Sequence, residues 1–149
     1  MSTDTIAIAS DHGAISLKQH LVTFLEAKGL KVLDLGAHNT DSVDYPEYGY
    51  AMANAIKEGK ASRGILMCGS GIGISIAANR FPEIRAALVT DVTCARLARE
   101  HNNANVLCMG GRMIGPDLAE ECVDTFLNTD FDQGERHLRR VAMLSSPPS

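Results

Sequence analysis

The stretch Arg63–Arg80, RGILMCGSGIGISIAANR, decides the fold of this chain. Its first part, Ile65-Leu66-Met67, is a short apolar run of the kind found in buried parallel strands. From Ile72 onward, Ile72, Ile76 and Asn79 recur at three- and four-residue steps, which predicts a helix. Cys68 therefore lies where a strand turns into a helix, in a loop that contains three glycines: Gly69, Gly71 and Gly73.

A strand-to-helix corner of this kind suits an anion. Glycines let the backbone approach a ligand closely, and the first N–H groups of a helix are unpaired and carry partial positive charge. We expect the N–H groups from Gly69 to Gly73 to bind a phosphate or a developing oxyanion. The same corner favours the thiolate of Cys68, so we expect its pKa to fall from about 8.5 toward neutrality, where a general base works best. The alternative is that Cys68 is only a small buried apolar residue.

The glycine spacing argues against a nicotinamide cofactor. Dinucleotide sites use G-x-G-x-x-G after the first strand, whereas this loop reads G-x-G-x-G, has Ile74 at the third small position and follows the third predicted strand. Asp91 is a tempting ribose ligand, but it follows a different strand. We therefore predict that the protein needs no cofactor.

Strands and helices alternate along the whole chain. Strands are predicted at residues 5–9, 31–35, 65–67, 85–89 and 106–109. Helices are predicted at 15–28, from a start at Pro46 into 50–57, from 72 onward, and at 93–100, 116–127 and 135–144. This order predicts one three-layer α/β domain over residues 1–145, Rossmann- or flavodoxin-like, with a five-stranded parallel sheet. We expect the Ser-Pro tail at 146–149 to be disordered.

Composition narrows the possible partners. The 149 residues carry a net charge of −4 without a basic run, which argues against nucleic acid and anionic membranes. No apolar stretch is long enough to cross a bilayer and no signal-peptide pattern is present, so we predict a cytoplasmic protein. The four cysteines form no C-x-x-C pair, which argues against a zinc knuckle and against the disulfide framework of a secreted protein. We interpret Cys94, Cys108 and Cys122 as packing residues.

Polar side chains follow the predicted strand ends. Because the carboxyl ends of parallel strands share one edge of the sheet, these residues should line one crevice. They are Asp11 and His12 after the first strand, Cys68 and Ser70 after the third, Asp91 after the fourth and Arg112 after the fifth.

Three other groups are candidates for a site. Arg136 and Arg140 share one face of the last helix and could grip a phosphate, although such a charge run is usually a solvated face. His101 and Asn102 end the fourth helix, where a histidine is often a cap or a surface residue. The Asp before Tyr45-Pro46 is a natural helix cap.

Together these motifs resemble a known family. S-D-H, D-Y-P, C-G-S-G-I-G-I-S-I-A-A-N-R, A-R-E-H-N-N-A-N-V, G-G-R and E-R-H-L-R-R occur in order between residues 6 and 141. They are similar to ribose-5-phosphate isomerase B, in the family that also holds galactose-6-phosphate isomerase subunits.

The resemblance implies a metal-free aldose–ketose isomerase that interconverts ribose 5-phosphate and ribulose 5-phosphate through an enediolate, a step of the pentose phosphate pathway. It implies that Cys68 moves the proton between C1 and C2, that Ser70 handles the proton on the sugar oxygen and that the Gly69–Gly73 amides hold the enediolate oxygen. His101, assisted by Asp11, would open the sugar ring. Tyr45 and Asn102 would line the sugar, and the phosphate ligands would be His12, Arg112, Arg136 and Arg140.

In this family the site lies between two subunits, so the resemblance also implies a homodimer or a dimer of dimers. The last helix would reach a partner, and the His101 and arginine segments would come from different chains. Two alternatives stay open. The substrate could be a six-carbon phosphate such as allose 6-phosphate or galactose 6-phosphate, or the chain could be a non-catalytic sugar-phosphate-binding subunit.

Overall fold

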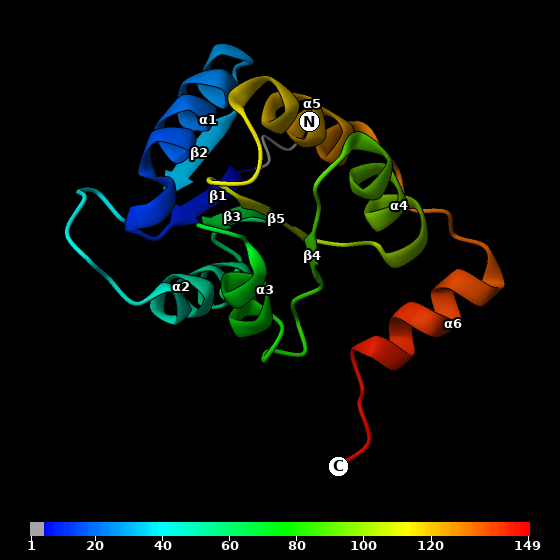
Figure 1. Cartoon of the computed structure of the whole chain (residues 1–149). Coiled ribbons are helices and arrows are strands. Elements are labelled where there is room, and N and C mark those ends of the chain that lie inside the picture. The colour runs from blue at the N-terminus through cyan, green and yellow to red at the C-terminus, as the bar shows by residue number, and fades with distance from the viewer. Residues whose placement is uncertain (1–4) are drawn as a thin grey trace.

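Five parallel strands form the central sheet, in the order β2-β1-β3-β5-β4 (Figure 1). The computed structural model describes residues 5–149. The strands are β1 (Thr5–Ser10), β2 (Lys31–Asp34), β3 (Arg63–Cys68), β4 (Ala86–Leu88) and β5 (Val106–Gly110). The three central strands are almost wholly buried, whereas the edge strands β2 and β4 are partly exposed. Burial on both faces explains why the central strands are apolar runs without alternation.

Helices cover both faces of the sheet, as predicted. They are α1 (Ile15–Ala27), α2 (Tyr45–Lys57), α3 (Ile72–Ala78), α4 (Val92–Asn102), α5 (Pro116–Asn128) and α6 (Glu135–Leu144). One face is packed by α1, α4 and α5, and the other by α2 and α3. Helix α6 lies beyond α4, outside these three layers (Figure 1). The predicted α/β domain with a five-stranded parallel sheet is therefore confirmed.

Helix α2 spans Tyr45–Lys57, so the predicted helix start at Pro46, leading into residues 50–57, is confirmed. The helix has Pro46 in its first turn, where the missing N–H of proline costs no hydrogen bond. Asp44 is the N-cap residue, but its side chain makes no capping hydrogen bond. This start places Tyr45 at the carboxyl edge of the sheet.

Two apolar side chains of α3 face outward. Ile72 and Ile76 are 53% and 54% exposed, whereas Ile74, Ala77 and Ala78 form the buried face of the helix. The helix itself is confirmed, but the two isoleucines that suggested it do not pack into the core of this chain.

The cysteines divide between core and surface. Cys108 and Cys122 are fully buried, so their interpretation as packing residues is confirmed. Cys94 is exposed in the first turn of α4, and its interpretation as a packing residue was wrong. Helix α4 turns Ala95 and Ala98 toward the core, which leaves the side chain of Cys94 outside.

Candidate active site

Cys68 ends β3 and is only 5% exposed. Its Sγ accepts a hydrogen bond from the backbone N–H of Gly71 at 3.1 Å. Gly71 is the N-cap residue of α3 and has a φ of 80°, a left-handed conformation that favours glycine. A Cβ there would also lie 2.7–2.9 Å from Leu88 and the backbone of Met109. A tightly packed glycine turn therefore directs an N–H group at the sulfur.

Ser70 is held by the same turn. Its Oγ accepts a hydrogen bond from the N–H of Ile72 at 3.2 Å, which leaves the hydroxyl proton for another acceptor. The expectation that all amides from Gly69 to Gly73 bind an external anion needs correction. The N–H groups of Gly71 and Ile72 already donate to Cys68 and Ser70, because the turn folds these side chains back onto the start of the helix.

The loop after β1 contacts this corner. Asp11 is 7% exposed, and its Oδ1 accepts a hydrogen bond from the N–H of Gly13 at 2.9 Å, which caps the 3₁₀ turn η1 (His12–Ala14). A Cβ on Gly13 would lie 3.5 Å from the backbone nitrogen of Gly69. The β1 and β3 loops thus pack directly against each other, as the shared sheet edge predicts.

Arg112 and Tyr45 complete this part of the site. The N–H of Arg112 donates to the carbonyl of Gly69 at 3.0 Å, and the side chain of Arg112 lies over Gly69, where a Cβ would be 3.5–3.6 Å from its guanidinium end. Tyr45 lies against Gly73 so closely that a Cβ on Gly73 would collide with the tyrosine ring. Asp11, Cys68, Ser70, Arg112 and Tyr45 are therefore gathered at one edge.

Asp91 follows β4 at this same edge, but it has a structural role. Its Oδ1 accepts a hydrogen bond from the N–H of Cys94 at 2.7 Å and caps α4. Its Oδ2 lies 3.6 Å from the thiol of Cys94. This contact raises the pKa of the Cys94 thiol, because a nearby carboxylate disfavours the thiolate.

Four predicted site residues lie elsewhere in the chain. Helix α4 runs back from the carboxyl edge, so at 1.5 Å per residue His101 and Asn102 lie about 15 Å along the helix from its start, toward the amino edge of the sheet. Arg136 and Arg140 are on α6, which packs beside α4. Within residues 5–149, no ion pair involves either arginine.

The His101 and arginine segments lie together. The ring of His101 stacks on that of His137 from α6, with centroids 4.8 Å apart and an angle of 9° between the rings. The expectation that the two segments come from different chains therefore needs correction, since one chain brings both to the same place. His137 is buried, with its Nε2 3.6 Å from a carboxylate oxygen of Asp132. The sequence carries no signal for this stack, since the two histidines lie on separate helices.

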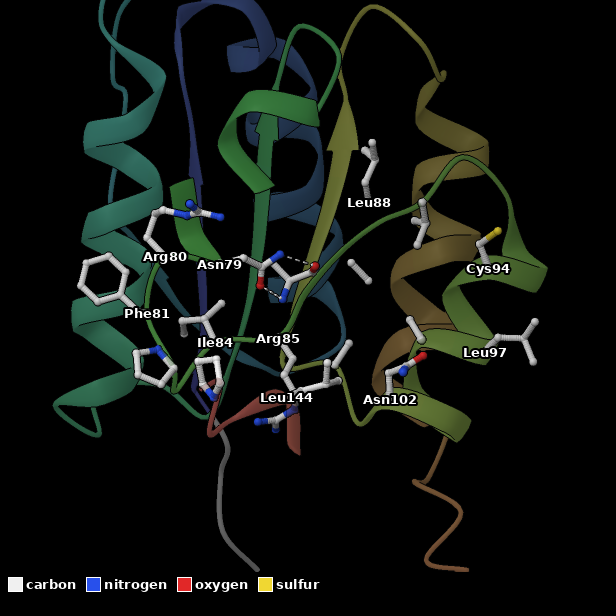
Figure 2. Close-up of a pocket in the computed structure, with 17 residues that line it drawn as sticks. Asn79, Arg80, Phe81, Ile84, Arg85, Leu88, Cys94, Leu97, Asn102 and Leu144 are labelled. Carbon is white, nitrogen blue, oxygen red and sulfur yellow. Dashed lines mark hydrogen bonds between the residues drawn. The ribbon is translucent and has the colours of Figure 1, made fainter. Parts of the chain in front are cut away.

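A groove of about 660 Å³ follows the free edge of β4 (Figure 2). Its wall is mostly apolar and includes Phe81, Ile84, Leu88 and Leu97, with Asn102 at one end. The side-chain amide of Asn79 covers part of this free edge. Its Oδ1 accepts a hydrogen bond from the N–H of Ala86 at 2.8 Å, and its Nδ2 donates to the carbonyl of Ala86 at 2.9 Å. Cys68 does not line this groove.

The two remaining buried cysteines are held as thiols. Burial raises the pKa of Cys122 to about 11 and also raises the pKa of Cys108 well above its usual value. Across the described part of the chain, no group of three His, Cys, Asp or Glu side chains is placed to hold a metal ion. None of its helices is both long and apolar enough to cross a bilayer.

A parallel α/β sheet that gathers a cysteine, polar side chains and an arginine at its carboxyl edge is typical of enzymes that act on small molecules. Comparison with known proteins narrows this class. A family profile described as Ribose/Galactose Isomerase matches residues 6–144. The chain is 40% identical over 141 residues to ribose-5-phosphate isomerase B of Escherichia coli (strain K12), covering 95% of this chain and 94% of that protein.

Two further relatives are also named as isomerases of sugar phosphates. D-erythrulose-4-phosphate isomerase of Pectobacterium atrosepticum is 45% identical over 131 residues, with 87% of this chain and 86% of that protein covered. The crystal structure of a ribose 5-phosphate isomerase from Thermotoga maritima superposes with a TM-score of 0.94 at 50% identity, covering 97% and 99% of the two chains. The chain belongs to the ribose/galactose isomerase family and is an isomerase.

Proposed function

We propose that this protein interconverts D-ribose 5-phosphate and D-ribulose 5-phosphate through an enediolate. The observation that carries the proposal is the buried thiol of Cys68, which accepts an N–H bond from Gly71 and lies beside Ser70, Asp11 and Arg112. The relatives that carry the name ribose-5-phosphate isomerase B support the choice of substrate.

Cys68 is the proposed base. The proton on the carbon next to a carbonyl is weakly acidic, so the reaction needs a base and stabilisation of the negative oxygen. In the aldose-to-ketose direction the thiolate takes the proton from C2, the C–H electrons form the enediolate double bond, and the same thiol then returns a proton to C1. The Gly71 N–H stabilises the sulfur while it is negative. The hydroxyl of Ser70 exchanges the proton on the sugar oxygens, and the amides of Gly69, Ser70 and Gly73 are left to face the enediolate.

The other residues bind the substrate. His12, Arg112, Arg136 and Arg140 are the proposed phosphate ligands, which would convert binding energy into positioning of C1 and C2. His101, with Asp11, would open the furanose ring, and Tyr45 and Asn102 would line the sugar.

These roles require two copies of the chain, because within one copy His101 and Asn102 lie at the end of α4 away from the carboxyl edge, about 15 Å along the helix from its start. We therefore propose a homodimer, or a dimer of dimers, in which α4 and α6 of one subunit complete the Cys68 corner of the other. The exposed side chains of Ile72, Ile76 and Leu88 support an interface on this side of the molecule. Contiguous exposed apolar surface is typical of subunit contacts.

The test is a turnover assay with ribose 5-phosphate, run on the wild type, Cys68→Ala and Cys94→Ala. Metal-free turnover that is lost only in Cys68→Ala, with phosphate binding kept, supports both the reaction and its base. Cys94→Ala is the matched control, since its thiol is exposed and has no proposed role in the reaction. Activity that survives in Cys68→Ala would contradict the role of this thiol.

The same assay tests the substrate. It is repeated with erythrulose 4-phosphate, allose 6-phosphate and galactose 6-phosphate, because a relative 45% identical to this chain is named for a four-carbon substrate. Turnover of one of these alone would keep the mechanism and change the substrate. No turnover of any of them would favour a non-catalytic sugar-phosphate-binding subunit.

A further inference from the structure

The segment between β2 and α2, residues 35–44, is anchored at its start by an ion pair between a buried lysine and a partly exposed aspartate. Lys18 of α1 is 1% exposed, and its Nζ lies 2.6 and 2.7 Å from the two carboxylate oxygens of Asp34. The Oδ1 of Asp34 also accepts a hydrogen bond from the N–H of Gly36 at 2.9 Å. A buried ammonium needs a partner at fixed geometry, so this pair fixes where the segment leaves the sheet.

The segment then continues alongside β1 beyond the end of β2. Ser10 donates its N–H to the carbonyl of Gly36 at 2.8 Å, and Ala37 donates back to the carbonyl of Ser10 at 2.7 Å. These bonds extend the parallel pairing up to the residue before Asp11. The segment is therefore tied to the strand that carries Asp11 and His12.

The far end of the segment is bonded to His12 itself. The backbone N–H of Val43 donates to the Nδ1 of His12 at 3.1 Å. Since Nδ1 is the acceptor, the proton of the neutral ring is on Nε2. The bond therefore fixes both the orientation of the ring and the nitrogen that can donate to a ligand.

We propose that the 35–44 segment is a positioning element for His12, acting through the amide of Val43. The inference rests on the proposed role of His12 as a phosphate ligand and explains how a neutral ring is held as a donor. The Nε2–H points its dipole at the phosphate, while the Val43 amide polarises the ring from the other side. Linkage then requires that phosphate on His12 strengthen the Val43 bond, as the bond strengthens phosphate binding.

The first test is amide hydrogen exchange of Val43, followed by NMR without phosphate in the wild type, His12→Ala and His12→Asn. The side-chain oxygen of Asn can replace Nδ1 as the acceptor. Exchange should be about tenfold faster in His12→Ala and close to the wild-type rate in His12→Asn. The reason is that losing one hydrogen bond changes the equilibrium between the protected and the open amide by about a factor of ten. An exchange rate that does not respond to His12→Ala overturns the inference, whatever the turnover assay shows.

The second test measures the binding of inorganic phosphate to the Val43→Pro and Val43→Ala variants. Proline removes the N–H and should weaken phosphate binding about tenfold, whereas alanine keeps the N–H and should leave it unchanged. Added phosphate should also slow the exchange of the Val43 amide in the wild type. Equal phosphate affinity in both variants overturns the positioning role. The two proposals can also fail separately. If His12→Ala speeds exchange of the Val43 amide, but the wild type neither binds phosphate nor turns over sugar phosphates, the proposed function is overturned. The Val43–His12 hydrogen bond is then still supported.

Discussion

The four cysteines show how far one residue type depends on its surroundings. Cys68 accepts an N–H bond from Gly71, whereas Cys108 and Cys122 lie in the core, where burial raises the pKa of each thiol. Cys94 is exposed, but the carboxylate of Asp91 raises its pKa. Only Cys68 combines a donor to its sulfur with a position at the carboxyl edge of the sheet.

At this scale we predict that Asp91→Asn makes Cys94 react faster. The asparagine keeps an oxygen that can cap α4 but removes the negative charge next to the thiol. The pKa of Cys94 should then fall toward its usual value, and more thiolate should be present at pH 8. The measurement is the rate of iodoacetamide alkylation at Cys94, followed by mass spectrometry. Asp117→Asn, a change on the first turn of α5, is the control and should leave the rate unchanged.

At the scale of elements, the contact between α2 and α3 holds the Cys68 corner in place. A Cβ on Gly49 of α2 would lie 2.8 Å from the Cβ of Ala77 and 3.1 Å from the carbonyl of Ile74, both on α3. Since α2 also begins with Tyr45, the close approach of the two helices sets the distance between that ring and the corner.

We therefore predict that Gly49→Ala destabilises the protein by about 1–3 kcal/mol, because the helices must separate to accept a methyl group. Urea unfolding followed by circular dichroism measures the loss. Asn54→Ala, on the exposed face of the same helix, is the control and should change stability by less than about 0.5 kcal/mol. Equal stability of the two variants would show that the contact is not tight.

We predict that removing Asp34 from the Lys18–Asp34 ion pair costs more stability than removing Lys18. Asp34→Ala leaves the Lys18 ammonium, whose side chain is 2% exposed, without its partner and should cost about 3 kcal/mol. Lys18→Met leaves Asp34, which is 32% exposed and keeps its bond to Gly36, so it should cost only about 1 kcal/mol.

Thermal and urea unfolding of both variants measure this difference. Lys60→Met, at an exposed pair with Glu58, is the control and should be nearly neutral. A larger loss in Lys18→Met than in Asp34→Ala would contradict the burial argument.

At the scale of the whole molecule, the separation of the two residue sets requires a partner subunit for the proposed reaction. In a homodimer each site would combine the corner of one chain with α4 and α6 of the other. Two inactive variants with defects in different halves can then complement each other.

We predict that Cys68→Ala and His101→Asn chains, each inactive alone, recover about one quarter of wild-type activity when they are refolded together. Half of the randomly formed dimers are mixed, and one of the two sites in each mixed dimer is intact. Cys68→Ala mixed with Ser70→Ala is the control, because both defects lie in the same half and no site is restored. No recovery in the first mixture would mean that the site does not form between subunits.

The sequence by itself determined the order of the elements, the parallel sheet and the strand-to-helix corner at Cys68. Apolar periodicity and glycine placement are local properties, so they can be read without knowing the fold. It also predicted which residues follow the strand ends, and the structure brings Asp11, Cys68 and Arg112 together.

Only the tertiary structure decided which side of each helix faces the core and which distant groups meet. The packing of α4 leaves Cys94 exposed. His137 of α6 stacks on His101, and the amide of Val43 in the 35–44 segment donates a hydrogen bond to His12. The same structure placed His101 at the end of α4 away from the carboxyl edge, with α6 packed beside it. These contacts join residues far apart in sequence or use backbone groups that every residue carries, so no local pattern of residue types encodes them.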